Sequence, residues 1–193
     1  MNARDLKYFA MEYLRFHKRC IYFCTEFGPH WCDVAGMDKT TFYEVEVKVD
    51  KYDFLADFKK EKHRLYKSGL GPNYFYFLVP QFLSGFCLEW LSEEKSPYGL
   101  LTPCEKVGKK GKPLRVLRAP KKLHDGKPGA KDIRKITMRM GSELINTYLS
   151  YKEACDMVNR RSEHYQRWEN ILNGKDNKSS GSDTEEQRVN RVG

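Results

Sequence analysis

The chain has 193 residues, enough for one domain with extensions, and its 40% hydrophobic and 13% aromatic content is typical of a folded protein. No apolar run approaches the length of a membrane span and the N-terminus has no signal-peptide pattern, so we expect a cytoplasmic protein without a membrane partner. The net charge of +9 is uneven, because residues 105–139 hold thirteen Lys or Arg against three Asp or Glu, a balance of +10. Such a concentration favours a nucleic-acid partner over a merely lysine-rich loop.

Two elements are predicted at the N-terminal end. Residues 3–18 place apolar side chains at helical spacing, and residues 19–26 form an aromatic and β-branched run that is typical of a strand. Glu12 lies at the edge of the helical stripe, and Glu26 ends the strand.

The next two runs predict a hairpin. Residues 31–37 are mostly apolar, and residues 42–49 alternate between an apolar row and a charged row, as a strand requires. Pairing the two runs brings Asp33 beside Glu46 and Lys48. Two carboxylates around a shared gap form an oxygen site that suits Mg²⁺, and an amine nearby can orient a metal-bound water or stabilise charge on a phosphate.

A helix with a basic face is predicted directly after this hairpin. Residues 50–67 begin with the N-cap Asp50 and are followed by helix-ending glycines. Residues 73–79 are almost entirely aromatic or β-branched, which predicts a strand buried on both faces. The order strand, helix, strand implies that this strand runs parallel to the central one. Residues 81–94 are compatible with a further helix.

The remaining segments predict a strand pair and a helical region. Residues 98–103 and 114–117 form the strand pair, and residues 132–172 are helical, with an interruption near Gly141 and an apolar stripe at residues 133–149 that we expect to pack on the core. Residues 151–170 are rich in paired charges and form a second helix or a partner surface, with packing on the core favoured. Residues 173–193 are Gly, Ser, Asn and charge, which predicts disorder. The basic residues here that could follow a phosphate backbone are Arg115, Arg118, Lys121 and Lys122.

Asp33, followed later by Glu46-Val47-Lys48, resembles the signature of the PD-(D/E)xK nuclease superfamily, with Cys32 in place of the usual proline. The wider sequence resembles the MmcB-like branch of that superfamily, which is associated with DNA repair. This resemblance covers about residues 20–120, and the segments that carry it are 32–35, 45–59, 73–80 and 98–101.

The resemblance implies a restriction-endonuclease-like α/β core, in which a mixed β-sheet is flanked by helices, here with a C-terminal helical extension. We accordingly expect a nuclease-like domain at residues 1–125, a helical extension packed on it at 126–172, and a disordered tail at 173–193.

The resemblance also implies a bound Mg²⁺ or Mn²⁺ ion. Asp33, Glu46 and the carbonyl of Val47 would hold the ion, and Lys48 would position or activate the attacking water. Glutamates near the start of the fold often assist, so Glu12 and Glu26 are alternative accessory ligands. In the resemblance the helix after the motif touches the substrate, and the phosphate contacts expected from it are Lys59, Lys62 and Tyr66.

We therefore expect a metal-dependent nuclease that hydrolyses DNA phosphodiester bonds in repair or recombination, with RNA as the alternative substrate. A homodimer is compatible with this class, because many of its members dimerise when they cut two strands. A second interpretation is a nuclease fold that holds DNA or a repair partner without cutting. A third is an interaction protein whose acidic row is merely solvated, which predicts that Asp33 and Glu46 lie apart.

Overall fold

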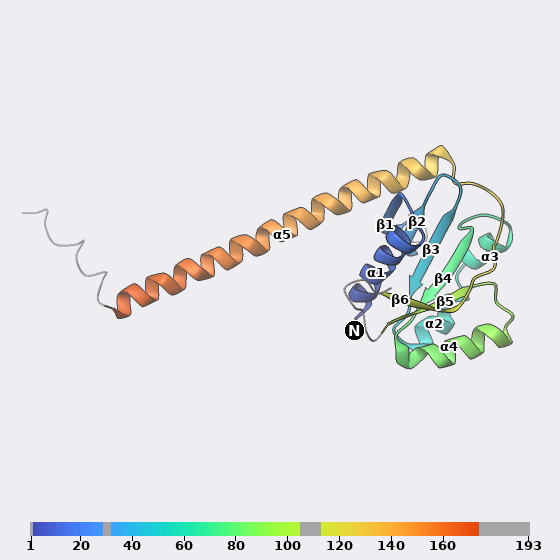
Figure 1. Ribbon diagram of the computed structural model, residues 1–193, viewed down its shortest axis with the longest axis horizontal. Helices are drawn as coiled ribbons and strands as arrows, with labels where there is room; N and C mark the ends of the chain where they lie inside the picture. The colour runs from blue at the N-terminus through green and yellow to red at the C-terminus, as the bar shows by residue number, and fades with distance from the viewer. Residues whose placement is uncertain (1, 29–31, 105–112, 174–193) are drawn as a thin grey trace, which may run out of the picture. The chain divides into compact units, whose positions relative to one another are not determined.

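The computed structural model describes residues 2–28, 32–104 and 113–173, which contain a six-stranded mixed sheet in the order β1-β2-β3-β4-β5-β6 (Figure 1). β1, β2 and β3 form an antiparallel meander, β4 and β5 run parallel to β3, and β6 returns antiparallel. The expected α/β class with a mixed, helix-flanked sheet is thereby confirmed. The strands are β1 (Tyr22–Phe27), β2 (Cys32–Met37), β3 (Phe42–Val47), β4 (Tyr74–Leu78), β5 (Gly99–Pro103) and β6 (Leu114–Arg118).

The predicted hairpin is present. Val34 of β2 pairs with Val45 of β3 in antiparallel register. The turn is closed by Asp38, whose Oδ1 accepts hydrogen bonds from the backbone N–H groups of Thr40 and Thr41 at 2.6 and 2.8 Å. A side chain that mimics a backbone turn in this way helps to fix the register of the two strands.

Helix α1 (Ala3–Glu12) covers one face of the sheet and continues into a π-helical turn, η1 (Tyr13–His17). The side chain of Asn2 accepts a hydrogen bond from the backbone of Asp5 and caps the helix start. The apolar stripe predicted for residues 3–18 therefore faces the core. The cluster beneath α1 and η1 includes Leu6, Ala10, Tyr13, Leu14, Val34, Val45, Val47, Tyr76 and Leu78.

The opposite face is covered by α2 (Lys51–Asp57), α3 (Lys62–Lys67) and α4 (Gln81–Glu93). The single helix predicted for residues 50–67 is wrong, because a turn at residues 58–61 separates α2 from α3. The reason is tertiary. Asp57 and Lys62, on either side of the turn, form a buried ion pair of 3.1 Å, and a continuous helix would carry them to different faces.

The charged row of β3 lies beneath these helices and not in solvent. Glu46 is in register with Phe77 of β4, whose ring belongs to the hydrophobic cluster under α2, α3 and α4. Only 7% of Glu44 and 4% of Glu46 is exposed. The interpretation of this row as a solvated surface is therefore wrong.

Helix α5 (Ala130–Leu172) is continuous through Gly141, so the predicted interruption is also wrong. Its first turns cover the edge strand β1. Arg139 Nε donates to the carbonyl of Thr25 at 3.0 Å, and the carboxylate of Glu143 accepts from the N–H and the hydroxyl of Thr25, both at 2.9 Å. These contacts occupy backbone groups that an edge strand would otherwise leave free.

The apolar stripe expected to pack along the whole of this helix does so only near its start. Ile136 is the fully buried residue of α5, whereas Leu144, Ile145, Tyr148 and Leu149 are at least half exposed. The chain divides into two compact units, residues 1–144 and 145–193, so the boundary falls inside the expected extension. No helix among the described residues, α5 included, is both long and apolar enough to cross a membrane.

The close packing of α1 and η1 against the sheet gives a first prediction. A Cβ atom on Gly36 of β2 would approach Cys20 Sγ to 2.9 Å and Leu14 Cδ1 to 3.0 Å. Gly36→Ala should lower the free energy of unfolding by about 1–3 kcal/mol, because an overpacked core must shift.

Gly85 of α4 is the matched control, since a Cβ there meets nothing within 4 Å. Gly85→Ala should raise stability by about 0.5–1 kcal/mol, because glycine weakens a helix interior. Urea denaturation measures both changes, and a Gly36→Ala variant as stable as the wild type would contradict the close approach.

Candidate functional site

Asp33 and Glu46 occupy adjacent positions on neighbouring strands. Because Val34 pairs with Val45, the next positions along the antiparallel ladder are Asp33 and Glu46. Asp33 Oδ2 accepts a hydrogen bond from the backbone N–H of Val47 at 2.8 Å, which ties its side chain to β3. Asp33 and Glu46 thus follow the same strand pair, but their side chains have different partners: Asp33 contacts Lys7, and Glu46 contacts Lys48, Lys60 and Lys62.

The other oxygen of Asp33 lies in a small charge cluster at α1. Lys7 Nζ is 2.7 Å from Asp33 Oδ1 and also forms an ion pair with Glu26. The pKa of Lys7 is raised, because the two carboxylates outweigh the lowering effect of burial. Of the two proposed accessory glutamates, Glu26 is thus the one linked to Asp33, whereas Glu12 lies at the C-terminal end of α1.

Glu26 has an unusual backbone. Its φ of +52° lies in the left-handed region, and the β1–β2 ladder passes from the Thr25–Val34 pair to the Phe27–Cys32 pair without a regular Glu26–Asp33 pair. A non-glycine residue in this conformation costs about 1–3 kcal/mol, and such strain often gathers at functional sites. At this irregular position the carboxylates of Glu26 and Asp33 both contact Lys7.

Glu46 belongs to a second, buried charge network. Its Oε1 lies 3.2 Å from Lys48 Nζ and 3.3 Å from Lys60 Nζ, and its Oε2 lies 2.9 Å from Lys62 Nζ. Asp57 closes the network, with Oδ1 3.1 Å from Lys48 Nζ and Oδ2 3.1 Å from Lys62 Nζ. The residues of this Glu46–Asp57 network are Glu46, Lys48, Asp57, Lys60, Lys62 and His63, with Asp53 at its rim.

The network is almost free of solvent and close to electroneutral. Asp57 is 0%, Lys62 1%, Lys48 3% and Glu46 4% exposed. The three carboxylates of Glu46, Asp53 and Asp57 face the three ammonium groups of Lys48, Lys60 and Lys62. Burial of charge is tolerated when every charge is paired, and it becomes costly when one partner is removed.

His63 connects this network to β5. Its Nε2 lies 2.9 Å from Asp57 Oδ2, and its Nδ1 lies 2.8 Å from the hydroxyl of Tyr98. A ring held at both nitrogens has a fixed orientation, which in turn fixes the carboxylate of Asp57.

The environment sets the charge state of Lys48. Burial alone would lower its pKa, but the carboxylates of Glu46 and Asp57 outweigh burial and raise it above its ordinary value. Burial likewise favours a raised pKa for Asp57, yet the hydrogen bond from His63 and the charge of Lys62 hold it well below its usual range. Lys48 is therefore an ammonium and Asp57 a carboxylate at neutral pH.

Glu44 is the one acid of the site with a raised pKa. Burial raises the pKa of Glu44 to about 7, although the Tyr66 hydroxyl donates a hydrogen bond to it and Lys62 lies nearby. Its charge thus changes within the physiological range.

Two observations bear on a metal ion. Among the described residues, no three His, Cys, Asp or Glu side chains are gathered as a metal site. However, the Lys7 ammonium already occupies the position between Asp33 and Glu26, and Oε2 of the buried Glu46 makes an ion pair without a well-aligned hydrogen bond. Asp33, Glu46 and Glu26, with the Val47 carbonyl, are oxygen donors of the kind that Mg²⁺ and Mn²⁺ bind. The donor chemistry fits the ion, but Asp33 and Glu26 are held by Lys7, and Glu46 is held separately by Lys48, Lys60 and Lys62.

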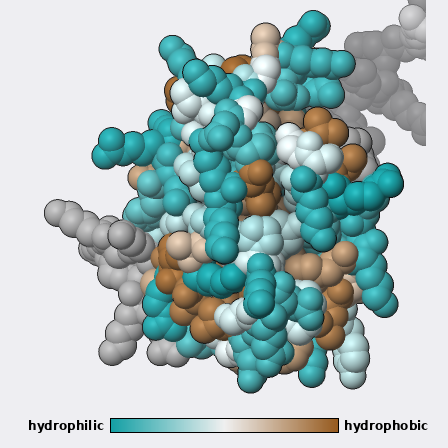
Figure 2. All heavy atoms as spheres, turned by 90° about the vertical axis from the view of Figure 1, so that its right-hand side faces the viewer, coloured by the Kyte–Doolittle hydropathy of each residue, from teal (hydrophilic) through white to brown (hydrophobic). Residues whose placement is uncertain are grey.

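A basic depression adjoins the network on the outside. It has a volume of about 500 Å³ and lies over the turn between α2 and α3. Lys60, which contacts both Glu46 and Asp57, forms its link to the interior. Figure 2 shows that the face carrying α3 is predominantly hydrophilic, with smaller hydrophobic patches. The depression is lined by Phe58, Lys59, Lys60, Glu61, His63, Arg64 and Lys67.

The residues predicted to contact phosphate are partly at the surface and partly not. Lys59 is exposed and lines the depression. Lys62 and Tyr66 are not available as surface contacts, because Lys62 is 1% exposed between Glu46 and Asp57 and Tyr66 is 6% exposed beside Glu44. The burial of Lys62 and Tyr66 could not be predicted from the sequence, because their helical spacing does not indicate that they contact buried carboxylates.

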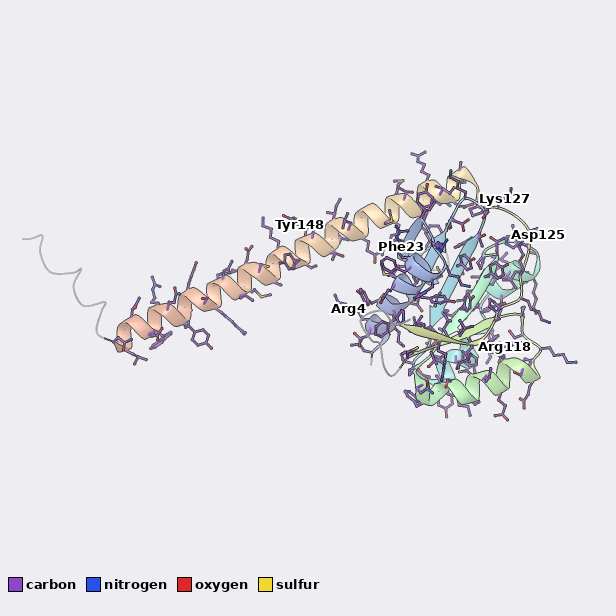
Figure 3. The ribbon with its side chains drawn as sticks, in the orientation of Figure 1. Arg4, Phe23, Arg118, Asp125, Lys127 and Tyr148 are labelled. Carbon is purple, nitrogen blue, oxygen red and sulfur yellow. The ribbon has the colours of Figure 1, made fainter. Side chains whose placement is uncertain are left out.

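The basic residues of the C-terminal half also differ in their roles. Arg118 is partly buried and its guanidinium donates to the carbonyl of Tyr98 at 3.0 Å, so it holds the end of β6 to the segment just before β5. Lys122 is paired with Asp125, while Arg115 and Lys121 are exposed. Figure 3 shows Arg118 below Asp125 and Lys127, which lie on the segment leading to α5. Residues 105–112, and residues 174–193 of the predicted tail, lie outside the described residues.

The comparisons with known proteins bear on the fold only. No protein-family model matches this chain, and no curated protein matches it. A solved structure of a protein of unknown function from Silicibacter pomeroyi aligns with a TM-score of 0.52 and 19% identity, over 75% of this chain and 89% of that chain. At this identity the similarity supports the α/β architecture with its mixed sheet and transfers no activity.

The buried network predicts that Asp57 and Asp53 differ strongly in their contribution to the free energy of unfolding. Asp57→Asn should destabilise the protein by about 3–5 kcal/mol, because Lys48 and Lys62 would keep buried charges without their carboxylate. Asp53→Asn is the control, since the Asp53 side chain is 48% exposed and its loss should cost less than about 1 kcal/mol. Guanidinium denaturation compares the two, and equal losses would contradict the network.

Glu44 predicts a pH dependence of stability. Its folded pKa of about 7 lies above the ordinary value of 4.5, so its contribution to stability is fully present below pH 4.5 and is lost as the pH rises through 7. Glu44→Gln should match the wild type near pH 4 and exceed its stability at pH 8 by up to about 3 kcal/mol. Urea denaturation at several pH values measures the difference, and a gap independent of pH would contradict the raised pKa.

Proposed function

We propose that this chain is a Mg²⁺- or Mn²⁺-dependent nuclease of the PD-(D/E)xK type that hydrolyses DNA phosphodiester bonds. The observation that carries the proposal is the placement of Asp33 beside Glu46 on paired strands, with Lys48 Nζ 3.2 Å from Glu46. The sheet order, in which a three-stranded meander is followed by a helical crossover to a parallel strand, agrees with a restriction-endonuclease-like core. The role in DNA repair rests on the resemblance, and the cytoplasmic location rests on the sequence pattern alone.

The residues that would hold the ion are Asp33, Glu46 and the Val47 carbonyl, with Glu26 as the accessory ligand. A bound divalent ion lowers the pKa of a coordinated water and offsets charge on the scissile phosphate. Lys48 and Lys62 are buried against Glu46, whereas Lys7 and Lys60 have side chains that are 24% and 49% exposed. Both are long and reach solvent, so they can move away at small cost.

Lys48 acts in this proposal as a fixed positive charge. Because its pKa is raised, it stays protonated and does not serve as a base. An ammonium held in place by Glu46 and Asp57 can donate hydrogen bonds to a phosphate oxygen and orient the attacking water. Asp57, with His63 behind it, is a positioning residue for this group.

The surface that would receive the nucleic acid is the basic depression over the α2–α3 turn. Lys59, Lys60, Arg64 and Lys67 line it, against the single acid Glu61, which is itself paired with Arg64. Contacts of this kind bind a phosphate backbone without reading its sequence, and their affinity falls as salt increases.

Mg²⁺-dependent cleavage of nicked, branched, single-stranded and duplex DNA tests the proposal. Asp33→Asn and Lys48→Met should each reduce the cleavage rate by about 10²–10³-fold or more, because each removes charge that stabilises the transition state. Lys51→Met is the control, since Lys51 is exposed at the start of α2 and outside the site. Circular dichroism and thermal melting show whether each variant is folded.

A specific observation favours a second candidate, a nuclease fold that binds DNA without cutting it. Three ammonium groups already surround Glu46, and a fourth neutralises Asp33. Titration calorimetry with Mg²⁺ and Mn²⁺ separates the candidates. Absence of metal binding, together with DNA binding that yields no products, would replace the nuclease proposal with this one.

A further inference from the structure

The second half of α5 carries apolar side chains at a spacing of seven residues. Five residues, at every seventh position from 144 to 172, form this pattern, and their exposed fractions lie between 65% and 80%. Tyr148, Cys155 and Trp168 lie three or four residues from members of this set and widen the stripe. The members of this heptad stripe are Leu144, Tyr151, Val158, Tyr165 and Leu172.

A seven-residue repeat points to one kind of packing. A straight helix with 3.6 residues per turn would let such a stripe drift around its surface, and a left-handed supercoil with a second helix keeps it in contact. Small residues, Ala154, Cys155 and Ser162, lie between the central members of the stripe. They leave room for the larger side chains of a second helix.

The length of α5 agrees with this interpretation. It has 43 residues, whereas α4, the next longest helix among the described residues, has 13. An average helix has about 11–12 residues, and a periodic pattern well beyond 25 is typical of coiled coils. No described helix of this chain other than α5 has enough length to cover the stripe.

The net charge of residues 145–172 indicates which kind of partner could cover the heptad stripe. Residues 145–172 contain four Lys or Arg and four Asp or Glu, and so are neutral in a chain with a net charge of +9. A nucleic acid would favour a basic helix, and an acidic protein partner would also do so. A second copy of this helix meets no net repulsion, and it supplies the same seven-residue repeat over the same length.

We propose that residues 144–172 of α5 form a two-helix coiled coil with the same residues of a second copy of this chain. The proposal stands independently of the nuclease activity. It assigns to the exposed half of α5 the role of a dimerisation surface, while Ile136, Arg139 and Glu143 fix the start of the helix to β1.

Sedimentation equilibrium of the full-length chain across the micromolar range tests the proposal. The wild type should have twice the mass of one chain. Val158→Glu, at the centre of the stripe, should raise the dimer dissociation constant by about tenfold or more, because a seam that excludes water would have to bury a charge. Since Val158 is 65% exposed in the single chain, the substitution should leave the fold intact.

Asn159→Glu is the matched control, because it adds the same charge one position along the helix and outside the stripe. It should leave the dissociation constant within a factor of two or so of the wild-type value. A wild type that remains monomeric overturns the proposal. So does a dimer that Val158→Glu leaves unchanged, since that dimer would use another surface.

Discussion

The structure depends on a buried carboxylate. Asp57 is fully buried at the end of α2 and faces Lys48 just after β3, Lys62 of α3 and His63, whose ring contacts Tyr98 just before β5. One residue thereby joins the end of β3, two helices and the segment that leads into β5. Charges buried to this degree are stable only as a balanced set, so the turn between α2 and α3 and the position of Lys48 are fixed together.

The same balance governs what the site can do. Lys48 is held as an ammonium, which suits a group that stabilises phosphate charge, and Glu46 is shared among three lysines. In the proposed nuclease, a divalent ion would compete with Lys7 for Asp33, and with Lys48, Lys60 and Lys62 for Glu46. Lys7 and Lys60 are the more exposed of these cations, and a phosphate would give them new partners.

Sequence reasoning succeeded where the signal is local or periodic and failed where distant residues decide. Strand alternation predicted the β2–β3 hairpin, and the crossover rule predicted the parallel pairing of β3 with β4. The break between α2 and α3 was missed, because each residue of 50–67 is compatible with a helix and the interruption comes from buried ion pairs to β3. The α5 stripe was assigned to the core because periodicity reports that a face is apolar and does not report what covers it.

By itself, the sequence determined the α/β class, the strand register at the acidic pair, and the concentration of positive charge after residue 104. These follow from side-chain alternation, turn residues and composition, which act over short stretches of chain. Only the tertiary structure decided that Lys62 and Tyr66 are interior residues, that Glu26 and Lys7 accompany Asp33, and that Asp57 and His63 support Lys48. These placements depend on contacts between residues that are distant in the sequence. Burial and charge pairing arise from such contacts, so no single segment of the chain predicts them.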